Sequence, residues 1–253
     1  MRGFLSGIAA VALLASAAVA AGVPASKHSA KETARAVAAG LANPERADQA
    51  GDDTRRKAAE VLAFSGVGPG DEVLDFLPGA GYWTRIFSGV VGKTGHVYAI
   101  WPAAGAKYAA KTLSALEARH MSNVTLKVLD AGIVGASEPV DLVWTVQNYH
   151  DINNNGGEAA IDAMNAAVLK ALKPGGTYIV IDHADPGSGL ASTNTTHRID
   201  PATVKTQVVR AGFEFVGEST ALANPADDHK ANVFDPAIRG HTDQFVYKFR
   251  KPR

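Results

Sequence analysis

The stretch that decides the fold is residues 72–84, which read EVLDFLPGAGYWT. Its first part, Val73–Phe76, is apolar except for Asp75 and is bounded by turn residues, and this pattern predicts a buried strand. Pro78–Gly81 then predict a tight turn whose glycines let a ligand approach the backbone closely. A helix is expected to begin at Tyr82, where free N–H groups and the positive dipole end favour an anionic group. Dinucleotide-binding enzymes usually have a third glycine where this chain has Thr84, so the pattern disfavours NAD.

Strands and helices alternate on the carboxyl side of this stretch. The strands are predicted at residues 72–76, 96–101, 124–129, 140–146, 177–181, 213–218 and 243–249, and the helices at 58–65, 82–91, 107–119, 158–172 and 201–211. Such alternation requires a parallel sheet with helices on both faces. The final two strands have no helix between them, which predicts an antiparallel pair. We therefore predict an α/β fold, a three-layer doubly wound sheet of seven strands with the last strand antiparallel. Ligands of such sheets bind beyond the carboxyl ends of the strands.

The first 53 residues of the 253-residue chain differ from the rest. Arg2 precedes an apolar run, Phe4–Val19, and the tripeptide Ala18-Val19-Ala20 matches the small-x-small pattern at which signal peptides are cut. We predict that residues 1–20 are a signal peptide, that the mature protein is periplasmic or secreted, and that it has no stable membrane insertion. Residues 21–53 are rich in alanine and are expected to form a mobile or loosely helical segment outside the core. Residues 54–253 then form one domain.

Composition limits the classes of partner. Lys plus Arg and Asp plus Glu both number 25, so no net charge attracts the protein to nucleic acid. A small-molecule partner fits better. Cysteine is absent from the chain, which excludes disulfides, thiolate metal sites and a cysteine nucleophile. The oligomeric state is not indicated by the sequence.

Two motifs carry a resemblance to a known family. Residues Val73–Gly81 resemble the first motif of class I S-adenosylmethionine-dependent methyltransferases, and Leu172–Thr177 (LKPGGT) resembles the turn that these proteins place before their fifth strand. More narrowly, residues 78–84, 147–151 and 224–235 are similar to a group of bacterial predicted methyltransferases, many with signal sequences. The likeness covers roughly residues 40–252. It implies a methyltransferase that uses S-adenosylmethionine and acts on a small molecule.

The resemblance also implies which residues bind the cofactor. Asp75, Gly79 and Gly81 would surround its methionine end, and Asp130 would hold the adenine amino group. Further candidates around the cofactor are Pro78, Ala80, Tyr82 and Asn148. One departure concerns the second strand, which ends at Trp101 where relatives have Asp or Glu for the ribose hydroxyls. Trp101 is expected either to stack on the adenine or to complete the core.

The fourth strand delivers Tyr149, His150 and Asp151 to the rim where the methyl acceptor is expected. His150 has a suitable ordinary pKa for a general base, and Asp151 is a candidate to orient it. The residue that faces the sulfonium is expected to be Tyr82, Trp83 or Tyr149. The alternative is that His150 and Asp151 only bond the loop to itself.

Further polar residues are expected to line an acceptor pocket at the same edge, namely His183, His197, Arg198 and His229. No two histidines of this set share a close ligand spacing along the chain, so we predict no metal site. Two alternatives to the methyltransferase stay open. One is an exported ligand-binding protein that kept the fold and lost the cofactor, and the other is a metal-assisted enzyme built on the histidines.

Overall fold

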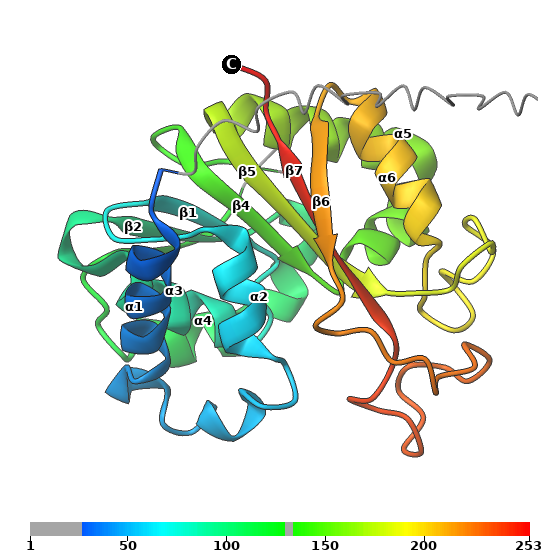
Figure 1. The fold of residues 1–253 in the computed structure, drawn as a ribbon, viewed down its shortest axis with the longest axis horizontal. Coiled ribbons are helices and arrows are strands. Elements are labelled where there is room, and N and C mark those ends of the chain that lie inside the picture. The colour runs from blue at the N-terminus through cyan, green and yellow to red at the C-terminus, as the bar shows by residue number, and fades with distance from the viewer. Residues whose placement is uncertain (1–26, 130–133) are drawn as a thin grey trace, which may run out of the picture.

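The computed structural model describes residues 27–129 and 134–253, and it contains one seven-stranded sheet (Figure 1). The strand order is β3-β2-β1-β4-β5-β7-β6, and β7 runs antiparallel to both of its neighbours. The strands are β1 (Glu72–Phe76), β2 (His96–Trp101), β3 (Val124–Val128), β4 (Val140–Val146), β5 (Leu172–His183), β6 (Glu214–Ser219) and β7 (Gln244–Arg250). The predicted fold class, including the antiparallel last strand, is confirmed.

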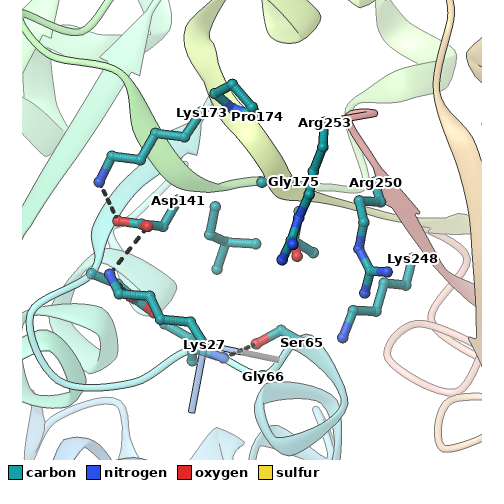
Figure 2. A pocket seen from close by; sticks show the side chains of 15 residues that line it. Lys27, Ser65, Gly66, Asp141, Lys173, Pro174, Gly175, Lys248, Arg250 and Arg253 are labelled. Carbon is teal, nitrogen blue, oxygen red and sulfur yellow. Dashed lines mark hydrogen bonds and ion pairs between the residues drawn. The ribbon is translucent and has the colours of Figure 1, made fainter. Parts of the chain in front are cut away.

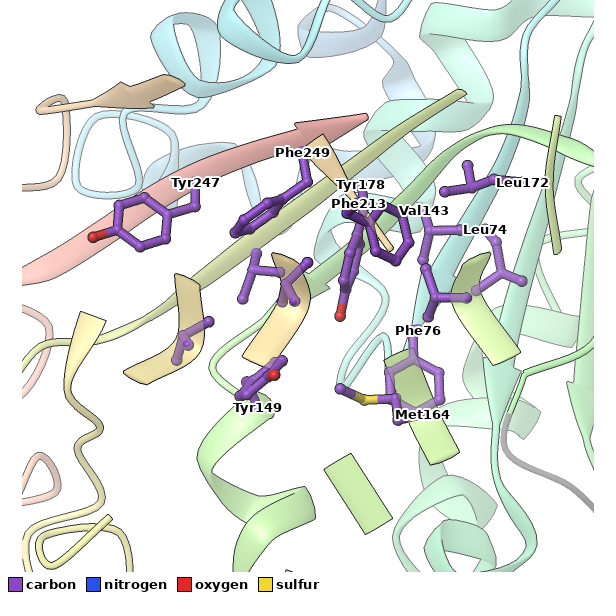
Figure 3. Close-up of a cluster of buried hydrophobic side chains, with 14 of the residues drawn as sticks. Leu74, Phe76, Val143, Tyr149, Met164, Leu172, Tyr178, Phe213, Tyr247 and Phe249 are labelled. Carbon is purple, nitrogen blue, oxygen red and sulfur yellow. The ribbon is translucent and has the colours of Figure 1, made fainter. Parts of the chain in front are cut away.

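Helices cover both faces of the sheet. One face packs against α1 (Ala30–Leu41), α2 (Ala58–Ser65), α3 (Tyr82–Val91) and α4 (Ala106–Glu117), and the other against α5 (Tyr149–Ala171) and α6 (Pro201–Arg210). Strand β1 shows how the apolar side chains of one strand divide between the two faces. Val73 belongs to the cluster under α3, whereas Leu74 and Phe76 belong to the cluster under α5 (Figure 3). Because successive side chains point to opposite faces and both faces are covered, neither set meets water.

Helix α5 begins earlier than the sequence predicts, at Tyr149 instead of residue 158. Two helical segments are joined there through Gly157, whose φ of 63° lies in the left-handed region. A glycine adopts that conformation at little cost, so it ends one segment and lets the next begin without a loop. The early start brings residues 149–151 into a helical turn directly after β4.

The alanine-rich segment contributes to the core, contrary to the expectation that it lies outside. Ser29 and Glu32 form a capping box at the start of α1, and Ala36 and Val37 are buried in the cluster with α3. The two helices meet at Gly40 and Gly89, since a Cβ on Gly89 would lie 2.8 Å from the Gly40 Cα. This close approach depends on a partner 49 positions away along the chain, which the periodicity of α1 does not show. The predicted signal peptide, residues 1–20, lies outside the described residues.

Among the described residues, no helix has the length and apolar character needed to cross a membrane.

Candidate functional site

The turn after β1 combines a tight backbone with open space. Leu77, Gly79 and Gly81 all have positive φ, at 54°, 54° and 72°. A Cβ on Gly81 would lie 2.7 Å from Leu116 of α4, so this glycine allows close packing. A Cβ on Gly79 would meet no described heavy atom within 4 Å, and Gly79 is exposed. Helix α3 begins at Tyr82 without a side-chain cap from the described residues. The loop therefore offers bare backbone and a helix N-terminus on one open side.

Asp75 supports this turn from inside the protein. Its carboxylate is buried and accepts a hydrogen bond from Thr84 Oγ1 at 2.6 Å. Burial raises the pKa of Asp75 to about 7, against the opposing effect of the hydrogen bonds from Thr84. Thr84 thus has a structural role at the position where dinucleotide-binding enzymes usually have glycine.

Asn148 joins the end of β4 to the same turn. Its Nδ2 donates to the carbonyl oxygens of Phe76 and Leu77, at 3.4 and 3.2 Å. Gln147 before it has a φ of 58°, which turns the chain from the strand into α5. The sequence predicted Asn148 near the cofactor, and the structure places its side chain against the glycine turn.

Residues ahead of α2 cover the turn from the other side. Gln49 Nε2 donates to the Ala80 carbonyl at 3.1 Å, and the Tyr82 hydroxyl donates to Asp53 Oδ1 at 2.7 Å. The guanidinium of Arg56 lies 4.6 Å from the centre of the Tyr82 ring. The guanidinium of Arg56 therefore already covers the face of the Tyr82 ring. This contact fits a structural role for Tyr82 better than contact with a ligand.

Trp101 belongs to the core. Only 2% of it is exposed, and it packs with Ala99, Ala109 and Leu116 beneath α4. Of the two roles that the sequence left open, the structure supports the second, because a buried indole cannot stack on an adenine. Asp130, the predicted partner of the adenine amino group, lies outside the described residues.

Tyr149 also points into the core, contrary to its predicted role facing a sulfonium. The side chain is fully buried in the cluster under α5 (Figure 3), and its hydroxyl accepts a hydrogen bond from Asn165 Nδ2 at 2.9 Å. Burial raises the pKa of the Tyr149 hydroxyl well above its usual value, so it stays protonated at neutral pH.

His150 is held by a carboxylate that the sequence analysis did not assign to it. Its Nδ1 lies 2.8 Å from Asp182 Oδ1, and its backbone N–H donates to Asp182 Oδ2 at 3.0 Å. Burial lowers the pKa of His150, but the charge and hydrogen bond of Asp182 outweigh it and raise the pKa overall. Asp182 therefore orients the imidazole, a role that the sequence predicts for Asp151. The sequence signal that could have identified this partner is Asp182 itself, a carboxylate that directly follows the apolar residues of β5.

Two further side chains lie close to Nε2, the other ring nitrogen of His150. His197 Nδ1 lies 3.3 Å from His150 Nε2, and Asp151 Oδ1 lies 3.4 Å from the same atom. His197 Nδ1 and Asp151 Oδ1 are 3.8 Å apart. His197 comes from the loop before α6, so the fold brings together residues 47 positions apart along the chain.

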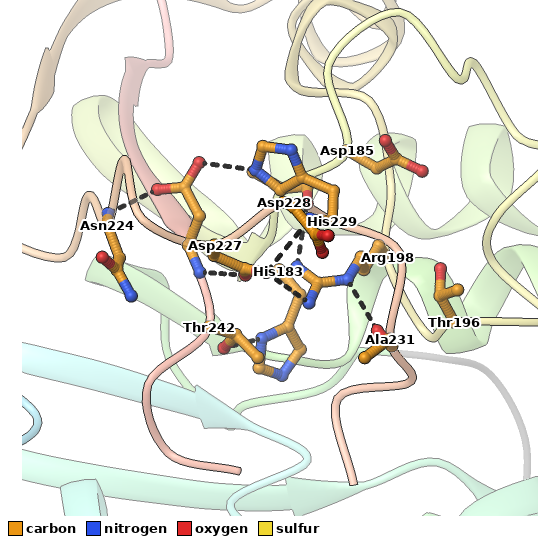
Figure 4. A network of polar contacts seen from close by, with 12 residues as sticks. His183, Asp185, Thr196, Arg198, Asn224, Asp227, Asp228, His229, Ala231 and Thr242 are labelled. Atoms are coloured by element: carbon orange, nitrogen blue, oxygen red, sulfur yellow. Dashed lines mark hydrogen bonds and ion pairs between the residues drawn. The ribbon is translucent and has the colours of Figure 1, made fainter. Parts of the chain in front are cut away.

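The other predicted acceptor-binding residues form a neighbouring polar network (Figure 4). Arg198 is fully buried and pairs with Asp227 at 2.8 and 3.1 Å. Its charge is therefore satisfied within the protein, and the structure does not support its predicted place in the lining of an acceptor pocket. His183 Nδ1 lies 2.8 Å from Thr242 Oγ1, and burial lowers the pKa of His183 to about 4. His229 Nε2 lies 3.1 Å from Asp243 Oδ2.

Backbone strain gathers at this edge of the sheet. Leu77, Gln147, His197 and His229 are non-glycine residues with φ between 54° and 61°. Such left-handed conformations cost free energy in side-chain-bearing residues and are concentrated at functional sites. All four come from loops that follow or face the carboxyl ends of β1, β4 and β5.

A cleft of about 360 Å³ lies at the opposite edge, beside the starts of β4 and β5 (Figure 2). Its basic side chains are partly paired, since Asp141 contacts both Lys27, at 3.1 Å, and Lys173, at 2.7 Å. Neither the glycine turn nor His150 lines this cleft. The predicted site residues thus belong to the carboxyl edge and not to this cleft.

Comparison with known proteins relates the chain to methyltransferases. No family model matches the chain. The chain is 28% identical over 202 residues to a ubiquinone/menaquinone biosynthesis C-methyltransferase, UbiE, of Ectopseudomonas mendocina, covering 74% of this chain and 66% of that protein. It spans about half the length, 49%, of further curated relatives of the same name.

Solved structures show the same fold. A S-adenosylmethionine-dependent methyltransferase from Aquifex aeolicus superimposes with a TM-score of 0.54 at 18% identity, covering 89% of this chain and all of that one. The N-methyltransferase NodS from Bradyrhizobium japonicum, in complex with S-adenosylhomocysteine, also gives 0.54, at 17% identity, covering 88% of this chain and all of that one. The fold is that of the class I methyltransferases, and the sequence relatives support the same family.

Proposed function

We propose that the protein is an S-adenosylmethionine-dependent methyltransferase that acts on a small molecule by in-line methyl transfer. The observation that carries this proposal is the turn Leu77–Gly81 at the end of β1. It stands at the position where the strand order reverses between β1 and β4, which is where doubly wound sheets bind their ligands. The curated relatives that match most of this sequence are methyltransferases, which supports the same activity.

The turn fits the methionine end of the cofactor. The exposed backbone at Gly79 and the uncapped start of α3 would bind its carboxylate, because free N–H groups and the helix dipole favour an anion. Asp75 and Asn148 hold the turn from behind, through Thr84 and the Leu77 carbonyl. When bound, the cofactor supplies a methyl group on a sulfonium.

His150 is the residue placed to accept a proton from the methyl acceptor. Asp182 holds Nδ1, so Nε2 points toward Asp151 and His197, both of which are partly exposed. An ionised, buried Asp182 favours the tautomer with the proton on Nδ1 and the lone pair on Nε2. A base held in this way contributes when the acceptor is an oxygen or nitrogen that must lose a proton.

A second candidate is a ligand-binding protein that has kept the fold and lost the cofactor. Its support is the buried Trp101 at the end of β2, where no carboxylate is present for the ribose hydroxyls. A hydrogen bond to a charged acceptor contributes roughly 1.5–3 kcal/mol, so its loss would weaken nucleoside binding by about 10- to 150-fold.

We also propose that the chain is exported. The support is the apolar run after Arg2 with its small-x-small end at Ala18–Ala20.

Calorimetric titration of the mature chain with S-adenosylmethionine and S-adenosylhomocysteine tests the enzymatic proposal. We expect saturable binding that Gly79→Val abolishes, because the valine side chain would fill the open side of the turn. Gly187→Val is the matched control, since Gly187 is also exposed, has a φ of 82°, and has no described atom within 4 Å of a built Cβ. Absence of binding at millimolar ligand in the unsubstituted protein would favour the second candidate. Equal binding by both variants would refute the placement at Gly79.

A further inference from the structure

Three potential ligand atoms from two segments converge at the carboxyl edge of the sheet. They are His150 Nε2, Asp151 Oδ1 and His197 Nδ1, and all lie within 4.8 Å of one another. We propose that these three atoms bind a divalent first-row transition metal ion, of the Zn²⁺ or Fe²⁺ type. This site goes beyond the proposed methyl transfer, which does not require a metal ion, and it uses the same His150 Nε2 lone pair, so the proposed base role of His150 belongs to the metal-free protein.

The separations between the atoms match a coordination face. His150 Nε2 lies 3.3 Å from His197 Nδ1 and 3.4 Å from Asp151 Oδ1. His197 Nδ1 and Asp151 Oδ1 are 3.8 Å apart. Zinc lies about 2.0–2.2 Å from nitrogen and oxygen ligands, and tetrahedral angles then place neighbouring ligand atoms roughly 3.3–3.6 Å apart. An ion can therefore contact all three atoms after small side-chain adjustments.

Asp182 holds His150 in the arrangement that metal-binding histidines show. The carboxylate is fully buried, and besides His150 Nδ1 it accepts the backbone N–H groups of His150 and His183, at 3.0 and 2.8 Å. A histidine that ligates a metal usually donates its other ring N–H to such a carboxylate. His150 Nε2 is thereby left with its lone pair directed at Asp151 and His197.

His197 is brought to the cluster by a strained backbone and held by aromatic contacts. Its φ is 55°, and its ring packs edge-on against His150 and Phe234, with centroids 5.4 and 5.0 Å away. Left-handed backbone in a side-chain-bearing residue is retained where the surroundings require it. The strain is consistent with a position that must present Nδ1 to the cluster.

The open side of the cluster indicates what kind of metal site it is. The side chains of Asp151 and His197 are 44% and 30% exposed, whereas that of His150 is 4% exposed. Three protein ligands with an open side are typical of catalytic sites, where the free position takes water or a ligand oxygen. Two histidines and one carboxylate are also the ligand set of non-haem iron enzymes. The negative charges of Asp151 and Asp182 balance a divalent ion.

The test is titration of the chelator-treated mature chain with Zn²⁺ by calorimetry and with Co²⁺ by visible absorption. We expect a single saturable site and cobalt d–d bands that report nitrogen and oxygen ligands. His197→Ala and Asp151→Asn should remove both signals. Asp182→Asn should weaken binding by about 10- to 100-fold, the usual effect of removing an outer carboxylate.

His241→Ala is the control, because His241 is an exposed histidine outside the cluster. Circular dichroism of every variant checks that it is folded, and the variant of the partly exposed His197 keeps the test valid if the variant of the buried Asp182 does not fold. Unchanged binding in His197→Ala, or no saturable binding in the unsubstituted protein, would overturn the proposal. The contact between the two imidazoles would then be a hydrogen bond alone.

Discussion

At the scale of single residues, the carboxyl edge depends on two buried carboxylates with opposite electrostatic surroundings. One of them is Asp182, which is fully buried. Burial raises the pKa of Asp182, but the charge and hydrogen bond of His150 outweigh this effect and lower the pKa overall. Asp75 accepts its hydrogen bonds from Thr84 and not from a cation, and burial raises its pKa to about 7. One carboxylate is thus ionised to orient an imidazole, and the other supports the glycine turn while partly protonated at neutral pH.

The raised pKa of Asp75 makes stability depend on pH. Between the ordinary value near 3.8 and about 7, the unfolded chain loses the proton while the folded chain keeps it. Stability contributed by the protonated group therefore falls as pH rises across this window. The asparagine in Asp75→Asn cannot ionise, so the variant does not lose this stability as pH rises. The free energy of unfolding of the variant minus that of the unsubstituted protein should therefore increase by up to about 3 kcal/mol from about pH 5 to above pH 7. Urea unfolding at about pH 5 and pH 8 measures this change, and a difference independent of pH would contradict it.

At the scale of elements, the loops beyond β5 and β6 are tied to each other by a buried ion pair. Arg198 comes from the loop that precedes α6, and Asp227 from the long loop between β6 and β7 (Figure 4). Arg198 also donates to the carbonyl oxygens of Ala184 and Ala231. This pair fixes the segment that carries His197, the neighbour of Arg198, and so positions one side of the candidate site.

Removing one partner of the pair should destabilise the protein strongly. Arg198→Met leaves the Asp227 carboxylate buried without its cation, at an expected loss of about 3–5 kcal/mol in the free energy of unfolding. Adding Asp227→Leu should recover a large part of that loss, because no charge then stays buried. Arg210→Met, which breaks an exposed pair with Asp162, is the control and should change little. Urea unfolding measures all four proteins, and a small effect of Arg198→Met would show that the pair does not fix the loops.

At the scale of the whole molecule, helices cover both faces of the sheet, so loops from distant parts of the sequence meet at the carboxyl edge of the strands. The turn after β1, the start of α5, and the loops around His197 and His229 all reach it. The N-terminal part of the chain takes part as well, since α1 packs on α3 and Gln49 contacts Ala80. One sheet therefore supports both the proposed cofactor turn and the proposed metal cluster.

Export of the molecule can be measured apart from its fold. A fusion of residues 1–25 to a reporter that is active only outside the cytoplasm should be active. Replacing Leu13 and Leu14 with arginine should abolish the activity, because the charges interrupt the apolar run. Mass spectrometry of the secreted or periplasmic full chain should find the new N-terminus at Ala21. An inactive fusion, or activity that the two arginines leave unchanged, would count against export.

The sequence by itself determined the order of strands and helices from residue 58 onward, the antiparallel end of the sheet and the glycine turn, because hydrophobic periodicity and turn residues are local signals. It also named every residue of the proposed metal cluster, but only as separate candidates. Only the tertiary structure decided that Trp101 and Tyr149 are core residues, that Arg198 is satisfied by Asp227, and that Asp182 orients His150. Side-chain direction and contacts between residues 47 positions apart, such as His150 and His197, depend on how the sheet brings its loops together. Spacing along the chain does not contain that information.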